Sequence, residues 1–391
     1  MVSKKILIIS HKPPYPKVDG GSIAIAQILE ALLEQGYHVT FLCMETDKHS
    51  SLTSITKTNL NFKAVYVNTK IKIASALSNM FTNQSYILSR FNQILFREAL
   101  KKILKKYSFD TILFESLFTS AYLNSVNEHS NAKKIYRAHN IENHIWFDQS
   151  NQNKNIFKKW YLNIQAERLK SEEIKFWNNI DSIISISETD TLHIKEQCPT
   201  PTQTIGLYTE NRHLQHNDES TKVDFFHLGA MDWHPNQDGI NWILKDVFPK
   251  VKQREKSAEI HIAGRAMPFK LKSHTQDGYH NHNEISNALD FMCKHKVMLV
   301  PLFSGSGIRV KIIEGMSLGK CIISTNIGVK GINCTNHKNI LIANTKNEFI
   351  EAMCFCIQNP KKVNKIGNEA KKYALEKFSK GQIMKELKKI I

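Results

Sequence analysis

The segment 301–320, PLFSGSGIRVKIIEGMSLGK, combines a turn of small residues with two cations at the start of an expected helix. The turn includes Ser306 and Gly307, and backbone N–H groups before a helix have no helical partners, so they can bind an anion. Arg309 and Lys311 fall in the first helical turns, where cations oppose the helix dipole and cost stability unless an anion compensates them. This arrangement predicts an anionic ligand.

One carboxylate follows the two cations. Glu314 lies one helical turn beyond Lys311. A carboxylate at this place can accept two hydrogen bonds from a ribose diol. We therefore expect the segment to bind a nucleotide rather than a simple anion.

A second candidate for phosphate binding is the loop HKPPYPKVDGGS at 11–22, between an expected strand and an expected helix. Gly20 and Gly21 lack Cβ atoms where the chain turns into the helix, so backbone N–H groups can face an anion. The alternative is a flexible turn with a glycine as helix N-cap. The pattern is not GxGxxG, so it does not indicate a nicotinamide-type site.

A histidine follows the strand expected at 134–140, in the segment YRAHNIE at 136–142. Open α/β sheets bind ligands at the carboxyl ends of their strands, which favours a functional position for His139. Asn140 and Glu142 could orient this imidazole or reach a hydroxyl group. A structural histidine is an equally open alternative.

Two segments in the second half of the chain also follow strands. In LGAMDWHPN (228–236), Gly229 comes after a strand, and Trp233 could stack on a base or a sugar or simply pack. In HIAGRAMP (261–268), Arg265 could grip a diphosphate with its planar guanidinium, and a surface salt bridge is the alternative.

These segments are positioned by strands that alternate with helix-period stretches, a rhythm that predicts parallel, doubly wound α/β sheets. The expected strands are 6–10, 38–44, 62–68, 111–116, 134–140, 182–187, 224–231, 259–264, 296–301 and 321–326. The expected helices include 22–34, 236–252, 309–318, 346–358, 361–377 and 380–390. Two such sheets facing each other would form a cleft at the carboxyl ends of their strands.

The alternation breaks around 198–222, at CPTPTQT and the polar run RHLQHNDEST. A chain of 391 residues is long enough for two domains. We therefore expect a Rossmann-like domain over 1–208 and a second Rossmann-like domain over 209–375.

Composition narrows the partners and the compartment. The net charge of +17 suits nucleic acid, phosphorylated metabolites or an anionic membrane face. A nucleic-acid partner is not expected, because no aromatic-interleaved basic strip or known module accompanies the charge. Seven scattered cysteines without a CxxC pair, and no long apolar run, predict a cytoplasmic protein in a reducing compartment.

A basic amphipathic helix is expected near the end of the stretch 71–107. Its lysines are Lys101, Lys102, Lys105 and Lys106. These lysines form either a solvated helix face or a binding surface. Such a surface would contact anionic lipid at the inner face of the cell membrane or a phosphorylated acceptor.

A long helix is expected over 155–178, and its aromatic side chains are expected to face the core. These aromatics are Phe157, Trp160, Tyr161, Phe176 and Trp177.

In order and spacing, the quoted segments resemble glycosyltransferase family 4, retaining nucleotide-sugar transferases with the GT-B fold, over nearly the whole chain. PPYPKVDGGS resembles the family's glycine-rich N-terminal loop, and RAHNIE its N-domain histidine segment. LGAMDWHPN, HIAGR and PLFSGSGIRVKIIEGMSLGK resemble successive elements of the C-domain. The last is the most specific, and with GAMDWHPN it resembles a subgroup found in bacterial surface-polysaccharide clusters.

The resemblance implies roles for the N-domain residues. Gly20 and Gly21 would lie against the donor phosphates, and His139 would lie near the transferred sugar and the acceptor. The terminal helix, about 376–391, would cross back to the N-domain.

The resemblance also implies that Arg265, Arg309 and Lys311 neutralise the leaving diphosphate. Glu314 matches the second glutamate of the family's E-x7-E motif, which holds the nucleotide ribose. The first glutamate of that motif falls at Ser306, so sugar contacts would come from Ser306, the backbone of Gly307 or elsewhere. An Arg/Lys pair common early in the family's C-domain is missing from GAMDWHPN, and Arg309 with Lys311 would take over its charge.

The resulting expectation is a retaining transferase that moves a sugar from a nucleoside diphosphate sugar to a glycan or lipid-linked acceptor. Neither a cofactor nor a metal is expected. The alternative is a non-catalytic protein that binds nucleotide sugars or polyanions.

Overall fold

The structure is a computed structural model that describes residues 4–17, 19–50, 55–209, 222–305 and 307–391. The chain divides into two compact units, each described here by itself. Met1–Leu207 with Ile383–Ile391 form the N-terminal unit, and Tyr208–Gln382 form the C-terminal unit. None of the described helices combines the length and apolar composition needed to cross a membrane.

The N-terminal unit contains a seven-stranded sheet in the order β3-β2-β1-β4-β5-β6-β7. Its strands are β1 Lys5–Ser10, β2 His38–Glu45, β3 Leu60–Tyr66, β4 Thr111–Glu115, β5 Lys133–Ala138, β6 Ser182–Ser185 and β7 Thr202–Thr204. Every pairing is parallel. Strands such as KILIIS are continuous apolar runs because helices cover both faces of such a sheet.

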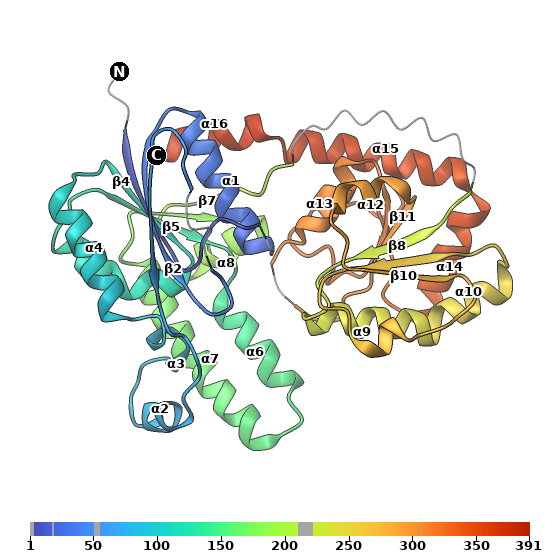
Figure 1. The fold of residues 1–391 in the computed structure, drawn as a ribbon, viewed down its shortest axis with the longest axis horizontal. Helices are drawn as coiled ribbons and strands as arrows, with labels where there is room; N and C mark the ends of the chain where they lie inside the picture. The colour runs from blue at the N-terminus through green and yellow to red at the C-terminus, as the bar shows by residue number, and fades with distance from the viewer. Residues whose placement is uncertain (1–3, 18, 51–54, 210–221, 306) are drawn as a thin grey trace. The chain divides into compact units, whose positions relative to one another are not determined.

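Most helices of the N-terminal unit lie against this sheet, whereas α6 and α7 lie side by side and extend beyond it, as does the short α2 (Figure 1). They are α1 Gly20–Glu34, α2 Ile73–Ser78, α3 Tyr86–Ser89, α4 Ile94–Lys106, α5 Leu123–Asn127, α6 Glu142–Gln152, α7 Ile156–Trp177 and α8 Glu188–Gln197, with 3₁₀ turns η1 Asn79–Phe81 and η2 Leu117–Tyr122. α16, Lys380–Ile390, begins in the C-terminal unit and ends in the N-terminal unit.

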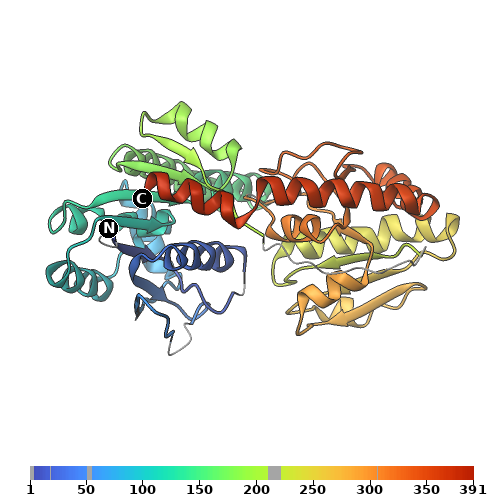
Figure 2. The ribbon, with the colours of Figure 1, turned by 90° about the horizontal axis from the view of Figure 1, so that it is seen from above.

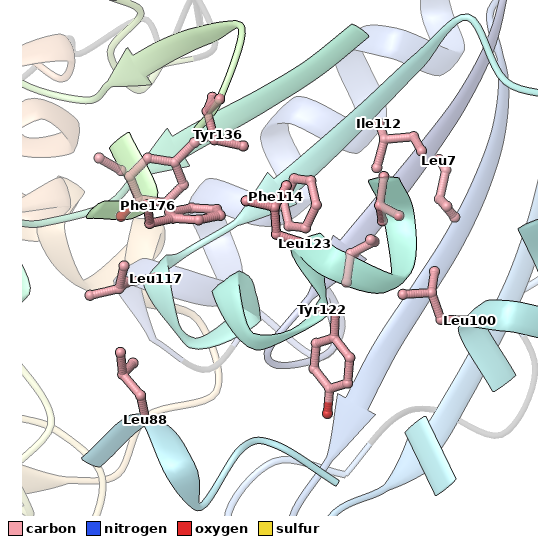
Figure 3. Close-up of a cluster of buried hydrophobic side chains, with 14 of the residues drawn as sticks. Leu7, Leu88, Leu100, Ile112, Phe114, Leu117, Tyr122, Leu123, Tyr136 and Phe176 are labelled. Atoms are coloured by element: carbon pink, nitrogen blue, oxygen red, sulfur yellow. The ribbon is translucent and has the colours of Figure 1, made fainter. Parts of the chain in front are cut away.

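Aromatic side chains fill the core between the sheet and α7 (Figure 3). The ring of Phe176 on α7 lies 5.7 Å from the ring of Phe114 on β4 and 5.0 Å from that of Tyr136 on β5. Trp177 is fully buried, so the expectation for these two α7 aromatics is confirmed.

The expectation was wrong at the other end of α7. Phe157 and Trp160 are 82% and 58% exposed, because the first turns of α7 extend beyond the sheet. Their neighbour Ile156 is 79% exposed.

The C-terminal unit contains a six-stranded parallel sheet in the order β10-β9-β8-β11-β12-β13. Its strands are β8 Phe225–Leu228, β9 Ile260–Ala263, β10 Tyr279–Asn283, β11 Val297–Val300, β12 Cys321–Ser324 and β13 Leu341–Ile342. Its helices are α9 His234–Trp242, the π-helix η3 Ile243–Val247, α10 Phe248–Arg254, α11 Phe269–Lys272, α12 Ala288–Lys294, α13 Val310–Ser317, α14 Lys346–Gln358 and α15 Pro360–Lys377. Figure 2 shows α15 in red and the α9–α10 stretch in yellow.

The two sheets confirm the expected doubly wound α/β fold class. In each sheet the strand order reverses once, between β1 and β4 in the N-terminal unit and between β8 and β11 in the C-terminal unit. Ligands of open α/β sheets bind beyond the carboxyl ends of strands at such reversals. The candidate site residues follow β1 and β5 in one unit, and β8, β9 and β11 in the other.

Candidate functional site

In the C-terminal unit, the chain leaves β8 and β9 through two glycines whose backbones touch. The N–H of Gly229 donates to the carbonyl of Ala263 at 3.1 Å. A Cβ atom on Gly264 would lie 1.8 Å from the carbonyl oxygen of Gly229, so a side chain at 264 is incompatible with this approach. The predicted residue Gly229 therefore stands at a closely packed crossing of two strand ends.

Lys311 reaches back from α13 to the same strand end. Its Nζ lies 3.2 Å from the carbonyl oxygen of Leu228, 3.0 Å from Oδ1 of Asn236 and 3.4 Å from Nε2 of His227. A Cβ atom on Gly229 would lie 3.0 Å from this ammonium group, so the glycine leaves room for it. The partners are a carbonyl, an amide and an imidazole, and none carries a negative charge.

The electrostatics of Lys311 follow from those neighbours. Burial and the positive charge of Arg309 lower the pKa of Lys311 to about 7. Burial and the charge of Lys311 in turn hold the pKa of His227 well below its usual range, so this ring is neutral. An anion at this place would favour the charged form of Lys311.

Arg309 and Trp233, predicted from separate segments, lie together. Arg309 is the N-cap residue of α13, and its guanidinium lies 5.1 Å from the centre of the Trp233 ring, a cation–π contact. Burial lowers the pKa of Arg309 to about 10. A Cβ atom on Gly305, whose φ is +109°, would approach Arg309 Nη2 to 2.8 Å and the Trp233 ring to 2.9 Å. Gly305 is thus required both by its backbone and by its neighbours.

Arg265 lies at this end of the sheet as well, one-third exposed. Its Nη2 donates to Oδ2 of Asp232 at 3.1 Å, and its carbonyl accepts from the N–H of Met231 at 2.9 Å. The surface salt bridge considered as the alternative is present. A partly exposed guanidinium with one carboxylate partner still has donors for a phosphate.

The remaining predicted residues of this group lie on or just before α13. Glu314 is half-buried in the second turn of the helix, and its carbonyl oxygen accepts hydrogen bonds from Leu318 N and Ser317 Oγ. Gly307 adopts a φ of +77°, which favours glycine. Ser306 lies outside the described residues.

In the N-terminal unit, His139 belongs to a buried group of charged side chains. Its Nε2 lies 2.5 Å from Oε2 of Glu115, the last residue of β4. Arg137 Nη1 donates to both carboxylate oxygens of Glu115 at 3.2 Å and to the carbonyl of Ala24 at 3.1 Å. All three charged or polar side chains are at most 7% exposed.

The protonation of this group can be read from its geometry. Burial raises the pKa of Glu115, but the charge of Arg137 and the hydrogen bond from His139 lower it further, so its carboxylate is ionised. Burial lowers the pKa of His139, so its ring is neutral at neutral pH. An ionised carboxylate only accepts, so Nε2 of His139 carries the proton and Nδ1 carries the lone pair.

The loop of Gly20 and Gly21 is tied to the same region through its own first residues. His11 Nδ1 lies 3.2 Å from the carbonyl oxygen of Glu115, and its ring lies 6.1 Å from that of His139. The adjacent Lys12 runs beneath Gly21, where a Cβ atom would lie 2.4 Å from its Nζ.

The N-cap of α1 differs from the alternative considered from the sequence. Asp19, rather than a glycine, caps the helix and forms a capping box with Ser22. Its carboxylate also accepts from Lys12 at 2.8 Å and contacts His49 at 3.0 Å. Burial raises the pKa of Asp19, but these hydrogen bonds and the Lys12 charge lower it far more. Gly20 follows as the first, exposed residue of α1.

Sequence reasoning named Glu142 as a residue that could orient His139, but Glu115 has that role, and Glu142 instead faces a second buried acid that was missed, Glu173. Glu173 on α7 accepts from the N–H groups of Glu142 at 3.0 Å and Asn143 at 3.1 Å, and from Asn143 Nδ2 at 2.7 Å. Burial and the facing charge of Glu173 raise the pKa of Glu142 to about 8, and burial raises that of Glu173 to about 7. Glu115 was also missed, although a glutamate at the end of the apolar run TILFE was a visible signal.

Residues 222–359 match the protein family described as Glycosyl transferases group 1. This stretch contains Gly229, Trp233, Arg265, Arg309, Lys311 and Glu314. An uncharacterized 44.6 kDa protein in the cps region of Klebsiella pneumoniae is 22% identical over 401 residues, which cover 98% of each chain.

Solved structures resemble the chain over nearly its full length. Sucrose-phosphate synthase from Thermosynechococcus elongatus has a TM-score of 0.74 at 15% identity, covering 99% of this chain and 98% of that one. HepE of Anabaena, in complex with UDP and glucose, has a TM-score of 0.66 at 10% identity, covering 99% of both. A TarM variant of S. aureus, in complex with UDP, Fondaparinux and alpha-GlcNAc-glycerol, reaches 0.69 at 12% identity, also covering 99% of both. The shared fold is GT-B, and with the family match it supports a glycosyltransferase.

Proposed function

We propose that this protein is a retaining glycosyltransferase that moves a sugar from a nucleoside diphosphate sugar to a glycan or lipid-linked acceptor. The observation that carries the proposal is the half-buried Lys311 beside Arg309. The groups around the Lys311 Nζ, which are Leu228 O, Asn236 Oδ1 and His227 Nε2, carry no negative charge. A diphosphate supplies the negative charge that such a pair of cations favours. The complexes of HepE and TarM with UDP support a UDP-type donor, and a GDP-linked donor is the other candidate.

The main catalytic contribution is electrostatic. As the bond between the anomeric carbon and the diphosphate breaks, negative charge grows on the departing phosphate oxygens. Arg309, Lys311 and Arg265 stabilise that charge from fixed positions, which is the most effective form of such stabilisation. These cations do the work of a divalent metal in other transferases, so the reaction is proposed to be metal-independent.

The nucleotide and the sugar occupy the residues around the cations. Glu314 accepts hydrogen bonds from the ribose, as a half-buried carboxylate on the same helix as Lys311 can. Trp233, held against Arg309, offers an aromatic face to the donor. Ser306 and the backbone of Gly307 contact the sugar in place of the first motif glutamate.

In the N-terminal unit, His139 is proposed to accept a hydrogen bond from a sugar or acceptor hydroxyl. Its Nδ1 carries the lone pair because Nε2 is committed to Glu115. Gly20 and Gly21 are proposed to approach the donor phosphates. The acceptor proton passes to the leaving phosphate itself, so no separate carboxylate base is required.

A peripheral contact with an anionic membrane is proposed for α4. The helix exposes Lys102, Lys105 and Lys106, while Ile94 and Leu95 are 73% and 72% exposed at its start. Basic and apolar side chains together bind anionic bilayers. Such a contact suits a lipid-linked acceptor in surface-polysaccharide synthesis at the inner face of the membrane. Co-sedimentation with anionic vesicles should be lost on charge reversal of these lysines.

The proposal is tested by a thermal-shift screen of UDP- and GDP-sugars, followed by transfer assays with the donor that stabilises the protein. We expect Arg309→Ala with Lys311→Ala to lower the transfer rate by about 10³-fold or more, since each donor to a developing charge contributes about 10²-fold or more. Lys346→Ala, an exposed lysine in the first turn of α14, is the matched control and should leave the rate unchanged. Full activity in the double variant would overturn the assignment.

One observation favours a second candidate, a non-catalytic nucleotide-sugar-binding protein. Ser306 stands where the motif of glycosyltransferase family 4 has a glutamate. Donor hydrolysis in the absence of acceptor separates the two functions. Tight binding of a nucleotide sugar with neither hydrolysis nor transfer to any acceptor would favour the second.

A further inference from the structure

Four histidines gather on the C-terminal unit, away from the residues considered so far. They are His261 on β9, His280 and His282 on β10, and His295 directly after α12. The ring of His261 lies 4.5 Å from that of His280, 5.3 Å from that of His282 and 4.2 Å from that of His295. Stacked imidazoles from three elements form a compact group of nitrogen ligands.

The strand register explains why these side chains meet. His261 and His280 are direct partners in the parallel pairing of β9 with β10, so their side chains share one face of the sheet. His282 lies where the register of the two strands shifts, between Asn281 and Asn283, and its Nε2 lies 3.0 Å from Nδ1 of His261. His295 directly follows α12, and α12 packs beside β8. The ring of His295 lies 5.7 Å from that of Phe226, and Phe226 is the residue on β8 that pairs with His261.

Three of the imidazoles have the spacing of a metal site. One ring nitrogen from each of His261, His282 and His295 lies within 4.8 Å of the other two. The Nδ1 of His261 is 3.0 Å from Nε2 of His282. Two ligands of a tetrahedral zinc ion, each about 2.0–2.1 Å from the metal, are separated by a little over 3 Å, so the cluster needs only small side-chain rotations.

The third imidazole is already oriented by a carboxylate. His295 Nδ1 lies 2.5 Å from Oδ2 of Asp224. The other carboxylate oxygen, Oδ1, accepts from the N–H of Lys296 at 2.8 Å. A carboxylate oxygen accepts at this distance, so Nδ1 of His295 donates to Asp224. Nε2 of His295 therefore carries the lone pair that can bind a metal ion. Histidines that bind metals commonly donate their other ring N–H to a carboxylate in this way.

The surroundings select the class of ion. Imidazole nitrogens suit zinc, copper and nickel, whereas calcium and magnesium prefer oxygen ligands.

We propose that His261, His282 and His295 bind one Zn²⁺ ion, with Asp224 orienting His295. The ion joins β9, the edge strand β10 and the end of α12. His261 is the second residue of β9, and Asp224 precedes β8, so this site lies toward the amino ends of the strands. Gly229 and Gly264 follow the carboxyl ends of the same strands, so the ion is structural and independent of donor binding.

The test is a titration of the chelator-treated full-length protein with Zn²⁺ by calorimetry, and with Co²⁺ by visible absorption. We expect one site and the absorption bands of a tetrahedral Co²⁺ complex. Saturating Zn²⁺ should raise the melting temperature by roughly 5 °C or more. His282→Gln, an exposed change on the edge strand, should weaken Zn²⁺ binding more than about tenfold.

Two further variants keep the proposal falsifiable. His337→Asn, at an exposed histidine with a φ of +59° that asparagine tolerates, should bind Zn²⁺ as the unchanged protein does. Loss of binding in His280→Gln but not in His282→Gln would overturn the assignment and move the ion to Glu259, His261 and His280, the other candidate group. Binding no tighter in the unchanged protein than in His282→Gln would also overturn it.

Discussion

The two groups of buried charge in this molecule are built on opposite principles. In the N-terminal unit, Arg137 is balanced by the carboxylate of Glu115, which also holds His139. In the C-terminal unit, Lys311 lies beside Arg309, and its Nζ contacts a carbonyl, an amide and an imidazole that carry no negative charge. The N-terminal group lies at the carboxyl ends of β4 and β5, and the C-terminal group follows β11; β4 and β11 each border the point where the strand order of their sheet reverses.

The difference separates positioning from binding. A balanced ion pair needs no ligand and holds one imidazole in one tautomer. Burial lowers the pKa of both Arg309 and Lys311, the charge of Arg309 lowers that of Lys311 further, and a bound anion favours the charged form of both. The N-terminal group is therefore a fixed support, and the C-terminal group is a receptor for charge.

The same substitution should have opposite effects on the two groups. Arg137→Met leaves the Glu115 carboxylate buried and unpaired, which should cost about 3–5 kcal/mol of stability. Lys311→Met removes a half-buried cation with no carboxylate among its hydrogen-bond partners, so it should leave stability unchanged or raised near neutral pH. The pKa of Lys311 falls on folding, so the folded protein loses stability as pH drops toward 7. Urea unfolding measures the stability of both variants. An equal loss of stability in Arg137→Met and Lys311→Met would contradict the proposed difference between the two groups.

Removal of the imidazole should affect turnover rather than binding. We expect His139→Ala to lower kcat by about 10²-fold and to leave the donor Kd unchanged, because the ring acts on a hydroxyl and not on the diphosphate. His38→Ala, at an exposed histidine that begins β2, is the matched control. An unaltered kcat in His139→Ala would remove this residue from the site.

Donor affinity should depend on pH through Lys311. Its pKa in the free protein is about 7, and a bound diphosphate raises it, so binding takes up a proton above that pH. The Kd of a nucleotide sugar should rise by up to about tenfold per pH unit between about pH 7 and 9. Lys311→Arg keeps its charge over this range and should abolish the slope. A pH-independent Kd in the unchanged protein would contradict the receptor interpretation.

The smallest effect is expected at the ribose. Glu314→Gln keeps one acceptor oxygen but loses the charge, so the nucleotide Kd should rise by about tenfold, or about 1.4 kcal/mol. The pH slope should persist, since Lys311 is intact. Calorimetry with the free nucleoside diphosphate, which has no sugar, should show the same loss of affinity if Glu314 binds the ribose. A loss seen only with the nucleotide sugar would indicate a defect in sugar binding instead.

Strands buried on both faces were predictable because they are apolar runs, and ten were expected within a few residues of their bounds. β7, Thr202–Thr204, was missed because its three residues lie in the stretch interpreted as the break between the domains. β10 was missed because its sequence, YHNHN, is polar on a sheet edge, and β13 has only two residues. Glu115 was missed because its partners come from another strand, so only the fold reveals the pair. Phe157 and Trp160 were misplaced because helix periodicity does not show where a helix leaves the body of its unit.

The contact between Gly229 and Gly264 bears on how any survey of variants should be interpreted. Alanine at 264 would force the ends of β8 and β9 apart and displace Lys311, although residue 264 donates nothing to a ligand. Loss of donor affinity there would measure spacing rather than contact. A mutational scan that ranks positions by lost activity would rank Gly264 with Arg309 and Lys311. It would then suggest that Gly264 contacts the ligand, although its role is to let two strand ends approach.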